Sequence, residues 1–458
     1  MKKTLLALCC LFTLPALAQD EQIQGFVHEQ SKATDYIWPT DEKVLQKLDE
    51  WQDLKFGVLF HWGLYSVPGI VESWSICSED VDWISRKEPL PYDEYKKWYF
   101  GLQKSLIPSN FNPEQWAQVM ENTGMKYMIF TSKHHDGFCM FDSKYTDFSI
   151  AKGPFRDNPR ADVARYVWQA FRDKGFMMGC YFSKPDWHSE YYWNPNYATA
   201  DRHQNYLKER HPEWWQNYIQ FTQNQLDELM TNYGHFDILW LDGGWVTGED
   251  IDLDKVLTKA RQTQPGLIAV DRACHNHNEN YQTPERGIPE TQLEYPWESN
   301  MPLSWDWGWV PNAPYKSARW IVNTLAEITA KGGCFLLGVG PTADGIIEER
   351  EVEILETAGR WIKANGKAIY KTRNAKHYHD GNTWFTADKD GRTLYAIYAL
   401  PEDQSLPTTI EWEDNIPTGK MKLVSTGKAV KYTVKGNHVT VTVPKGLNDS
   451  FALEFVQK

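Results

Sequence analysis

Asp242 stands at the end of an apolar run and before two glycines, where a buried strand could present a carboxylate. Residues 236–241 are apolar except for Asp237, a composition typical of a strand covered on both faces of a parallel sheet. Gly243 and Gly244 allow the chain to turn sharply after the strand. In α/β enzymes the catalytic groups lie at such strand ends. Asp242 is therefore our first catalytic candidate, and capping of the next turn or helix is the alternative.

A second carboxyl group would complete the pair that hydrolyses glycosidic bonds. In a retaining mechanism one carboxylate attacks the anomeric carbon, and the other carboxyl protonates the departing oxygen. Two candidates follow the predicted fifth strand, Glu285 after Thr283-Pro284 and Glu298 after Trp297. Both are expected in long loops rich in proline and aromatic residues, which are typical of functional segments. The residue types alone leave both candidates open.

Other predicted strands also end in polar or aromatic side chains. These are His61-Trp62 at the end of the first strand, Lys133-His134-His135-Asp136 after the second, Tyr181 in the third and Asp271-Arg272 after the fifth. Imidazoles, a phenol, an indole and a guanidinium provide directional donors and acceptors for sugar hydroxyls. The alternatives are that His61 is a core histidine bonded to backbone, and that Arg272 forms a structural ion pair with Asp271.

A metal site at His134, His135 and Asp136 is the competing interpretation of the paired histidines. Neighbouring side chains on an extended chain point in opposite directions, so one site rarely takes both histidines. The chain also has no pair of histidines at helical spacing that would support zinc binding. We predict that the protein uses no metal and no other cofactor.

Strand-like apolar runs alternate with helix-like periodicity from Asp53 onward, which predicts a parallel sheet with helical crossovers. The predicted strands are residues 56–62, 126–132, 175–182, 236–241, 267–270 and 334–339, with 290–295 as a weaker seventh. Helices are predicted after Asn112-Pro113, Asn158-Pro159 and Pro212, and over the apolar stripes 318–328 and 354–362.

The pattern changes after about Tyr370 to short alternating runs separated by turn residues. The predicted strands there are residues 394–400, 422–425, 430–434, 439–443 and 451–455. The predicted fold is therefore α/β, with a TIM-like (β/α) barrel over residues 19–368 followed by an antiparallel β-sandwich over residues 369–458. The sandwich could brace the barrel, or bind glycan if aromatics such as Trp384 or Trp412 are exposed.

Residues 1–18 have the pattern of a cleaved export signal. Lys2 and Lys3 precede an apolar stretch that ends in small residues before Gln19. We expect export to the periplasm or the medium; a lipid anchor on Cys9 or Cys10 is the alternative. No later run is long enough to span a bilayer. A net charge of -13 disfavours nucleic-acid partners, and five widely spaced cysteines outside the signal disfavour a disulfide scaffold.

Several motifs, taken in order, closely resemble the α-L-fucosidase family of retaining glycoside hydrolases. They are FHWGLYSVP at 60–68, KHHDG at 133–137, Trp240-x-Asp242, the paired glycines at 332–333 and GVGPTADG at 338–345. The resemblance covers most of residues 53–365. It implies a catalytic barrel with a C-terminal β-sandwich, and an exo-acting enzyme that releases terminal fucose from oligosaccharides or glycoconjugates. Glycosidases for another terminal sugar and non-catalytic glycan-binding proteins are the alternatives.

The resemblance also implies roles for single residues. Asp242 matches the nucleophile of the family. The positions that match fucose-binding residues are His61, Trp74, His134, His135, Tyr181, Trp240 and Arg272, joined by Glu72 and Trp307. The family often has adjacent Glu-Trp where this chain has Glu72-Ser73-Trp74. Glu285 lies 43 positions after Asp242 (285 minus 242), as in one group of members, so it is chosen as the acid/base, with Glu298 as the fallback.

Overall fold

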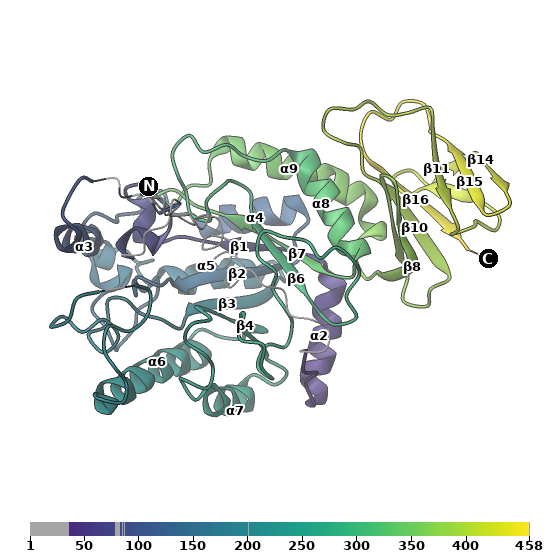
Figure 1. Ribbon diagram of the computed structural model, residues 1–458. Helices are drawn as coiled ribbons and strands as arrows, with labels where there is room; N and C mark the ends of the chain where they lie inside the picture. The colour runs from purple at the N-terminus through teal and green to yellow at the C-terminus, as the bar shows by residue number, and fades with distance from the viewer. Residues whose placement is uncertain (1–35, 78–82, 85, 87, 200, 458) are drawn as a thin grey trace, which may run out of the picture.

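The computed structural model describes residues 36–77, 83–84, 86, 88–199 and 201–457 of the 458-residue chain. The predicted signal segment, residues 1–18, lies outside these residues. Figure 1 shows a sheet of parallel strands surrounded by helices, followed at the C-terminal end by antiparallel strands on one side of the sheet domain. The alternation expected from the sequence is therefore present.

Seven parallel strands form one curled sheet in the order β5-β4-β3-β2-β1-β7-β6. They are β1 (Phe56–Phe60), β2 (Tyr127–Lys133), β3 (Met177–Ser183), β4 (Ile238–Asp242), β5 (Ile268–Asp271), β6 (Glu298–Pro302) and β7 (Cys334–Val339). Apart from Met177, every residue in these strands is buried. The near-continuous apolar runs in the sequence reflect this coverage on both faces.

The sheet closes through an irregular segment, residues 279–286, which lies between β5 and β6. The Asn280 amide donates to the Ala269 carbonyl of β5 at 2.9 Å, and the Glu298 amide of β6 donates to the Gln282 carbonyl at 2.7 Å. Bridges also join Glu285 to Asn300 of β6. This segment therefore takes the place of an eighth strand and brings Glu285 to the same end of the barrel as Asp242.

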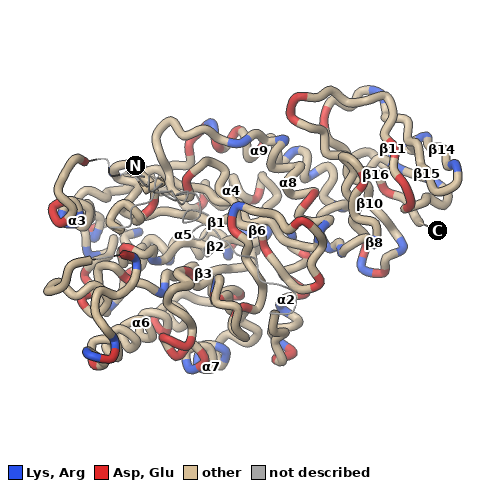
Figure 2. The backbone as a smooth tube through the Cα atoms, in the orientation of Figure 1, with Lys and Arg blue, Asp and Glu red and all other residues tan. Residues whose placement is uncertain are grey.

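Helices pack around the outside of the sheet (Figure 1). They are α2 (Glu42–Leu54), α3 (Tyr92–Gly101), α4 (Pro113–Thr123), α5 (Val163–Asp173), α6 (Pro212–Asn232), α7 (Leu253–Thr263), α8 (Ala318–Ala330) and α9 (Glu349–Asn365). Asn112 caps α4 by accepting from the Gln115 amide at 3.1 Å, as Asn-Pro predicts. Figure 2 shows Lys and Arg segments next to Asp and Glu segments around α6 and α7. No helix in these described ranges has the length and apolar character needed to cross a membrane.

The C-terminal part is built from a six-stranded and a three-stranded antiparallel sheet. The strands are β8 (Arg373–Asp380), β9 (Thr383–Ala387), β10 (Thr393–Tyr398), β11 (Thr409–Glu413), β12 (Met421–Leu423), β13 (Ala429–Val430), β14 (Tyr432–Lys435), β15 (His438–Thr442) and β16 (Phe451–Val456). Trp412 is buried in the core of this part, and its ring stacks on Phe455 at 6.0 Å. Trp384 is partly buried and stacks on His379 at 4.0 Å. Neither tryptophan is the exposed glycan-binding aromatic considered above.

Three sequence predictions about elements were wrong. Residues 290–295 are not a strand; the strand is β6, whose first residues, Glu298, Ser299 and Asn300, are polar. Because they are polar, no apolar run marks this strand, although all of it is buried. Glu298 therefore lies in a strand and not in a loop. The Asn158-Pro159 pair forms a turn, with Asn158 accepting from the Arg160 amide at 2.8 Å, and α5 begins only at Val163.

Candidate active site

Asp242 is the last residue of β4, and three hydrogen bonds hold its carboxylate. Tyr181 of β3 donates its hydroxyl to Oδ2 at 2.6 Å, and Arg272, which follows β5, donates to Oδ1 at 2.8 Å. The amide of Gly243 donates to Oδ1 at 2.8 Å. The carboxylate lines the pocket and is only 8% exposed. In the register of β3 and β4, Tyr181 lies beside Trp240. This register brings the Tyr181 hydroxyl within reach of Asp242 at the end of β4.

The charge of Asp242 is stabilised in spite of its burial. Burial alone would raise the pKa of this carboxyl, but the Arg272 guanidinium and the Tyr181 hydroxyl more than offset it and lower the pKa well below the usual range. Asp242 is therefore ionised at neutral pH. An ionised carboxylate in a cavity is the state that a nucleophile requires.

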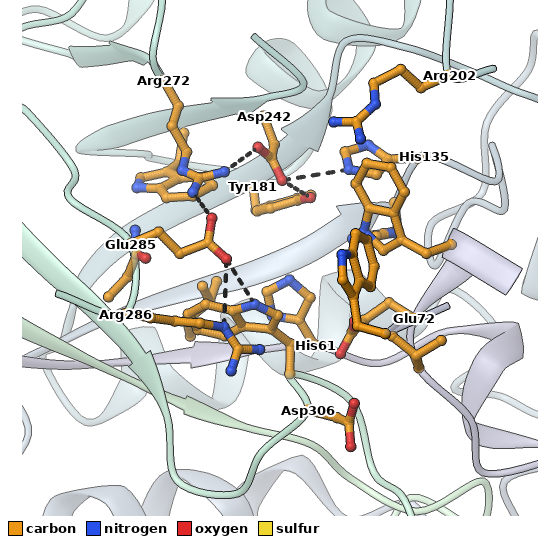
Figure 3. A pocket seen from close by; sticks show the side chains of 18 of the residues that line it. His61, Glu72, His135, Tyr181, Arg202, Asp242, Arg272, Glu285, Arg286 and Asp306 are labelled. Carbon is orange, nitrogen blue, oxygen red and sulfur yellow. Dashed lines mark hydrogen bonds and ion pairs between the residues drawn. The ribbon is translucent and has the colours of Figure 1, made fainter. Parts of the chain in front are cut away.

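Arg272 joins the two candidate catalytic carboxylates. One terminal nitrogen bonds Asp242, and the other bonds Glu285 Oε2 (Figure 3). Burial would lower the pKa of Arg272, but Glu285 and Asp242 raise it, so the guanidinium stays charged. The indole N–H of Trp307 donates to the second oxygen of Glu285 at 3.2 Å. The alternative pairing of Arg272 with Asp271 is wrong: Asp271 pairs with Lys184.

The paired histidines lie together in the site as neutral rings. Burial lowers the pKa of His134 to about 4 and that of His135 well below the usual value. Both follow the end of β2, where the chain is no longer extended, and their rings lie 4.2 Å apart. The expectation that they point in opposite directions was therefore wrong.

Hydrogen bonds assign the proton on His135. The Ser183 hydroxyl donates to the Pro185 carbonyl at 2.7 Å, so it can only accept from His135 Nδ1, 2.7 Å away. Neutral His135 then has an unprotonated Nε2, which lies 3.8 Å from Asp242 Oδ2. This nitrogen can accept a hydrogen bond from a sugar hydroxyl beside the nucleophile candidate.

Glu72 forms the opposite side of the pocket. Its Oε1 accepts from the Gly308 amide at 2.7 Å. Burial, with Asp306 nearby, raises the pKa of Glu72 to about 7. The residue between Glu72 and Trp74 is Ser73, whose hydroxyl bonds His134 Nδ1 at 2.5 Å. Ser73, which separates Glu72 from Trp74 in this chain, therefore contacts a pocket histidine, and both Glu72 and Trp74 still line the pocket.

A cavity of about 690 Å³ brings the predicted residues together at the carboxyl ends of the strands. All eleven chosen residues line it: His61, Glu72, Trp74, His134, His135, Tyr181, Trp240, Asp242, Arg272, Glu285 and Trp307 (Figure 3). The sequence prediction missed other lining residues, among them Arg202, Trp245, Arg286 and Asn300. Proximity to Asp242 and Glu285 in the chain could have indicated Trp245 and Arg286, whereas Arg202 lies in a long loop with no such signal.

Glu298 does not line this cavity. It is fully buried inside the barrel, where it accepts from the Tyr127 hydroxyl at 2.7 Å and from the Trp240 indole N–H at 3.2 Å. Burial raises its pKa to about 8. Glu298 therefore holds the Trp240 indole by a hydrogen bond inside the barrel and does not reach the pocket. The geometry favours Glu285 as the second carboxyl group.

His134, His135 and Asp242 offer ligand atoms within 4.8 Å of one another, which is close enough for a metal ion. Arg272 already balances the charge of Asp242. A further cation next to Arg272 would be repelled. The cluster suits hydroxyl recognition better than metal binding, and the absence of a cofactor requirement stays a prediction.

Comparison with known proteins identifies the family. The family model described as alpha-L-fucosidase matches residues 24–367. The chain belongs to this family of glycoside hydrolases. It is 28% identical to the plasma alpha-L-fucosidase of Homo sapiens over 79% of this chain and 78% of that protein. It is also 28% identical to an alpha-L-fucosidase of Branchiostoma floridae over 89% of this chain and 91% of that protein.

Solved structures of fucosidases share the fold. Alpha-L-fucosidase isoenzyme 1 from Paenibacillus thiaminolyticus aligns with a TM-score of 0.75 at 28% identity, over 91% of this chain and all of that chain. The Thermotoga maritima alpha-fucosidase in complex with a mechanism-based inhibitor aligns with a TM-score of 0.72 at 27% identity, over 92% of this chain and all of that chain. These findings confirm the barrel and sandwich fold and the enzyme class inferred from the sequence motifs.

Proposed function

We propose that this α-L-fucosidase removes terminal fucose by double displacement, with Asp242 as nucleophile and Glu285 as acid/base. The observation that carries this assignment is the Arg272 guanidinium, which holds both carboxylates at one pocket wall. A single guanidinium bonding two carboxylates keeps them close, as suits retaining enzymes, whose carboxyl groups lie about 5–5.5 Å apart.

In the first step an Asp242 oxygen bonds to the anomeric carbon while the glycosidic C–O bond breaks. The electron pair goes to the departing oxygen, which takes the proton of Glu285. Protonated Glu285 carries no charge to pair with Arg272, so we expect the bound sugar to separate them. In the second step Glu285 takes a proton from water, whose oxygen displaces Asp242 from the anomeric carbon.

The remaining pocket residues bind the sugar. Neutral His135 accepts from a hydroxyl at Nε2, and ionisable Glu72 on the opposite wall bonds another hydroxyl. Fucose lacks a hydroxyl on its sixth carbon, so its methyl group suits an apolar surface, for which the Trp307 ring, 5.2 Å from His61, is our candidate. A sugar with a hydroxyl at that carbon would leave a polar group unpaired, at a cost of roughly 1–3 kcal/mol.

The substrate class is a fucosylated oligosaccharide or glycoconjugate outside the cytoplasm. The export signal at residues 1–18 supports this location, and N-terminal sequencing of the mature protein should give Gln19. No metal, nucleic-acid partner or membrane insertion is part of this proposal, and the division at residues 368–369 rests on the change of sequence pattern there.

The mechanism is tested by following the anomer first released from an aryl α-L-fucoside by proton NMR. We expect α-L-fucose first, and an Asp242→Asn variant at least about 10³-fold slower in kcat. The carboxamide keeps the shape of the side chain while it removes the nucleophilic charge and one of the two acceptor oxygens. First release of β-L-fucose, or an Asn variant with wild-type turnover, would refute the assignment.

A further inference from the structure

Trp305 is an exposed tryptophan on the wall of the catalytic pocket. Its side chain is 68% exposed, more than any other large apolar side chain in the described ranges, and it lines the pocket. Leaving an indole in water gives up the free energy of burial, about 25 cal/mol per Å² of apolar surface. An indole that stays exposed at a pocket offers a flat face on which a sugar ring can stack.

Trp305 lies on the side of the pocket that carries Glu285. Arg286, the next residue after Glu285, donates to the Trp305 carbonyl at 2.7 Å, and its Nε lies 3.8 Å from Glu285 Oε1. The Arg286 guanidinium also stacks over Trp307 at 5.3 Å, whose N–H bonds Glu285. Figure 3 shows Glu285, Arg286 and Asp306 on the side away from Arg202.

Hydrogen bonds fix the backbone on both sides of Trp305. Lys316 donates to the Ser304 carbonyl at 2.7 Å, and the Gly308 amide donates to Glu72. Arg286 itself has a positive φ of 53°, a conformation that non-glycine residues rarely adopt, and its amide bonds the Asn300 carbonyl at 2.9 Å. Such local strain is typically kept where it orients a functional group. The backbone that carries the indole is thus fixed by hydrogen bonds, which reduces the entropy lost on binding.

The direction of the leaving group follows from the role of Glu285. The acid/base must reach the glycosidic oxygen, so the rest of the leaving group continues past Glu285 toward the exposed wall. Arg286 and Asp306 on that wall have opposite charges, and both can bond hydroxyl groups. A wall of one indole with balanced charges suits an uncharged sugar ring.

We propose that Trp305 is the stacking platform for the first sugar of the leaving group, an uncharged pyranose whose hydroxyls bond Arg286 and Asp306. This inference rests on the proposed function, because it takes Glu285 as the acid/base. It makes Trp305 a specificity-determining residue for the leaving group, separate from the residues that bind fucose.

The chain offers a matched control on another part of the same pocket. Trp83 also lines the pocket and is 47% exposed. Its ring contacts Trp74 edge-on at 5.3 Å, and Trp74 in turn contacts His135. Trp83 thus belongs to the side that carries His135, and not to the side that carries Glu285.

The test compares two substrates that differ only in the leaving group. One is α-L-fucosyl fluoride, whose fluoride cannot reach Trp305; the other is the disaccharide cleaved fastest from a panel of fucosyl-galactoses and fucosyl-N-acetylglucosamines. For Trp305→Ala we expect the ratio of kcat/KM for the disaccharide to that for the fluoride to fall about tenfold or more. Trp305→Phe should keep most of the ratio, and Trp83→Ala should change it less than twofold.

An unchanged ratio in Trp305→Ala would overturn the platform while leaving the fucosidase assignment intact, provided that fucosyl fluoride is still hydrolysed. An equal fall in Trp83→Ala would also overturn it, because the effect would then not depend on the Glu285 side. A wild-type protein that does not hydrolyse fucosyl fluoride would instead refute the proposed function.

Discussion

The side chains around Asp242 prepare it to act as a charged group inside a buried pocket. Tyr181 and Arg272 donate to different oxygens of the carboxylate, so both lone-pair regions are stabilised where water is mostly excluded. Fixed donors of this kind need no reorganisation during the reaction. The neutral histidines nearby add hydrogen-bonding capacity without adding charge.

The roles of Glu285 and Glu298 separate in a chemical rescue experiment. With an aryl fucoside, Glu285→Ala should slow turnover by about 10²–10⁴-fold, because no base activates the water that releases the sugar. Added azide, which needs no base, should restore turnover and give fucosyl azide. Glu298→Gln is the control, and its rate should not respond to azide. Azide rescue of Glu298→Gln alone would contradict the assignment.

Site residues could be predicted from the sequence where they lie at the ends of apolar strands. Asp242, Tyr181 and Arg272 follow or end apolar runs, so their types and positions were sufficient to select them. Asn300 and Arg202 also line the pocket, but the first lies in a strand without an apolar run and the second in a long loop. Which loop residues reach a pocket depends on tertiary contacts that a local pattern does not contain.

The turn after β4 decides where Asp242 points. Gly243 has a positive φ of 81°, and a Cβ atom there would lie 2.2 Å from Pro185 Cδ. This proline follows β3, so the two strand ends pack without space for a side chain. The paired glycines in the sequence therefore meet a steric requirement as well as a conformational one.

A matched pair of glycine variants tests this requirement. Gly243→Ala should lower the free energy of unfolding by roughly 1–3 kcal/mol and lower kcat, because Asp242 must move with the turn. Gly175→Ala has a similar φ of 75° but open space around its Cβ position. It should lose about 1 kcal/mol from backbone strain and keep wild-type kcat. Equal effects on kcat from both variants would contradict the steric explanation.

Elements with strong local signals were predicted well. The apolar runs gave six of the parallel strands, and Asn-Pro at 112–113 gave the start of α4. The polar strand β6 was missed because it has no apolar run, and the partner that allows Glu298 to be buried, Tyr127, is distant in sequence. The segment at 279–286 is irregular, so its position between β5 and β6 could not be read from the sequence pattern.

At the scale of the molecule, the two units pack against each other through α8 and α9. Asn323 of α8 donates to the Leu400 carbonyl at 2.8 Å, and Trp361 of α9 donates to the Ser450 carbonyl at 2.6 Å. Ser450 also bonds Asn323 at 3.0 Å. These bonds join the outer face of the barrel, away from the cavity, to the C-terminal unit, and they support a bracing role for the sandwich.

Buried acids in the barrel should make stability depend on pH. The pKa of Glu298 is raised from 4.5 to about 8 by burial, so the folded protein keeps a proton that the unfolded chain has released. The stability that protonated Glu298 contributes is fully present below pH 4.5, where the unfolded chain is protonated as well. It decreases as the pH rises from 4.5 and is lost as the pH passes through about 8. Burial raises the pKa values of Glu72 and Asp136 to about 7, which acts in the same direction.

Calorimetry can measure this dependence. Buried His61, His134 and His135 act in the opposite direction below about pH 6.5, because burial lowers their pKa values and the folded protein keeps them neutral. Glu298→Gln has the same histidines but cannot ionise at position 298. The Tm of the wild-type protein minus that of Glu298→Gln should therefore fall by on the order of a few degrees between pH 5 and pH 8. A Gln variant with the same pH dependence as the wild-type protein would show that Glu298 does not carry a proton in the folded state.

We expect Asp242 to bond covalently to fucose during turnover. The most direct measurement is to incubate the protein with 2-deoxy-2-fluoro-α-L-fucosyl fluoride, digest it at low pH and locate the added sugar by tandem mass spectrometry. One residue should carry the label, Asp242, in the peptide that contains β4. A label on another residue, or none while the inactivator still abolishes turnover, would refute the covalent role of Asp242.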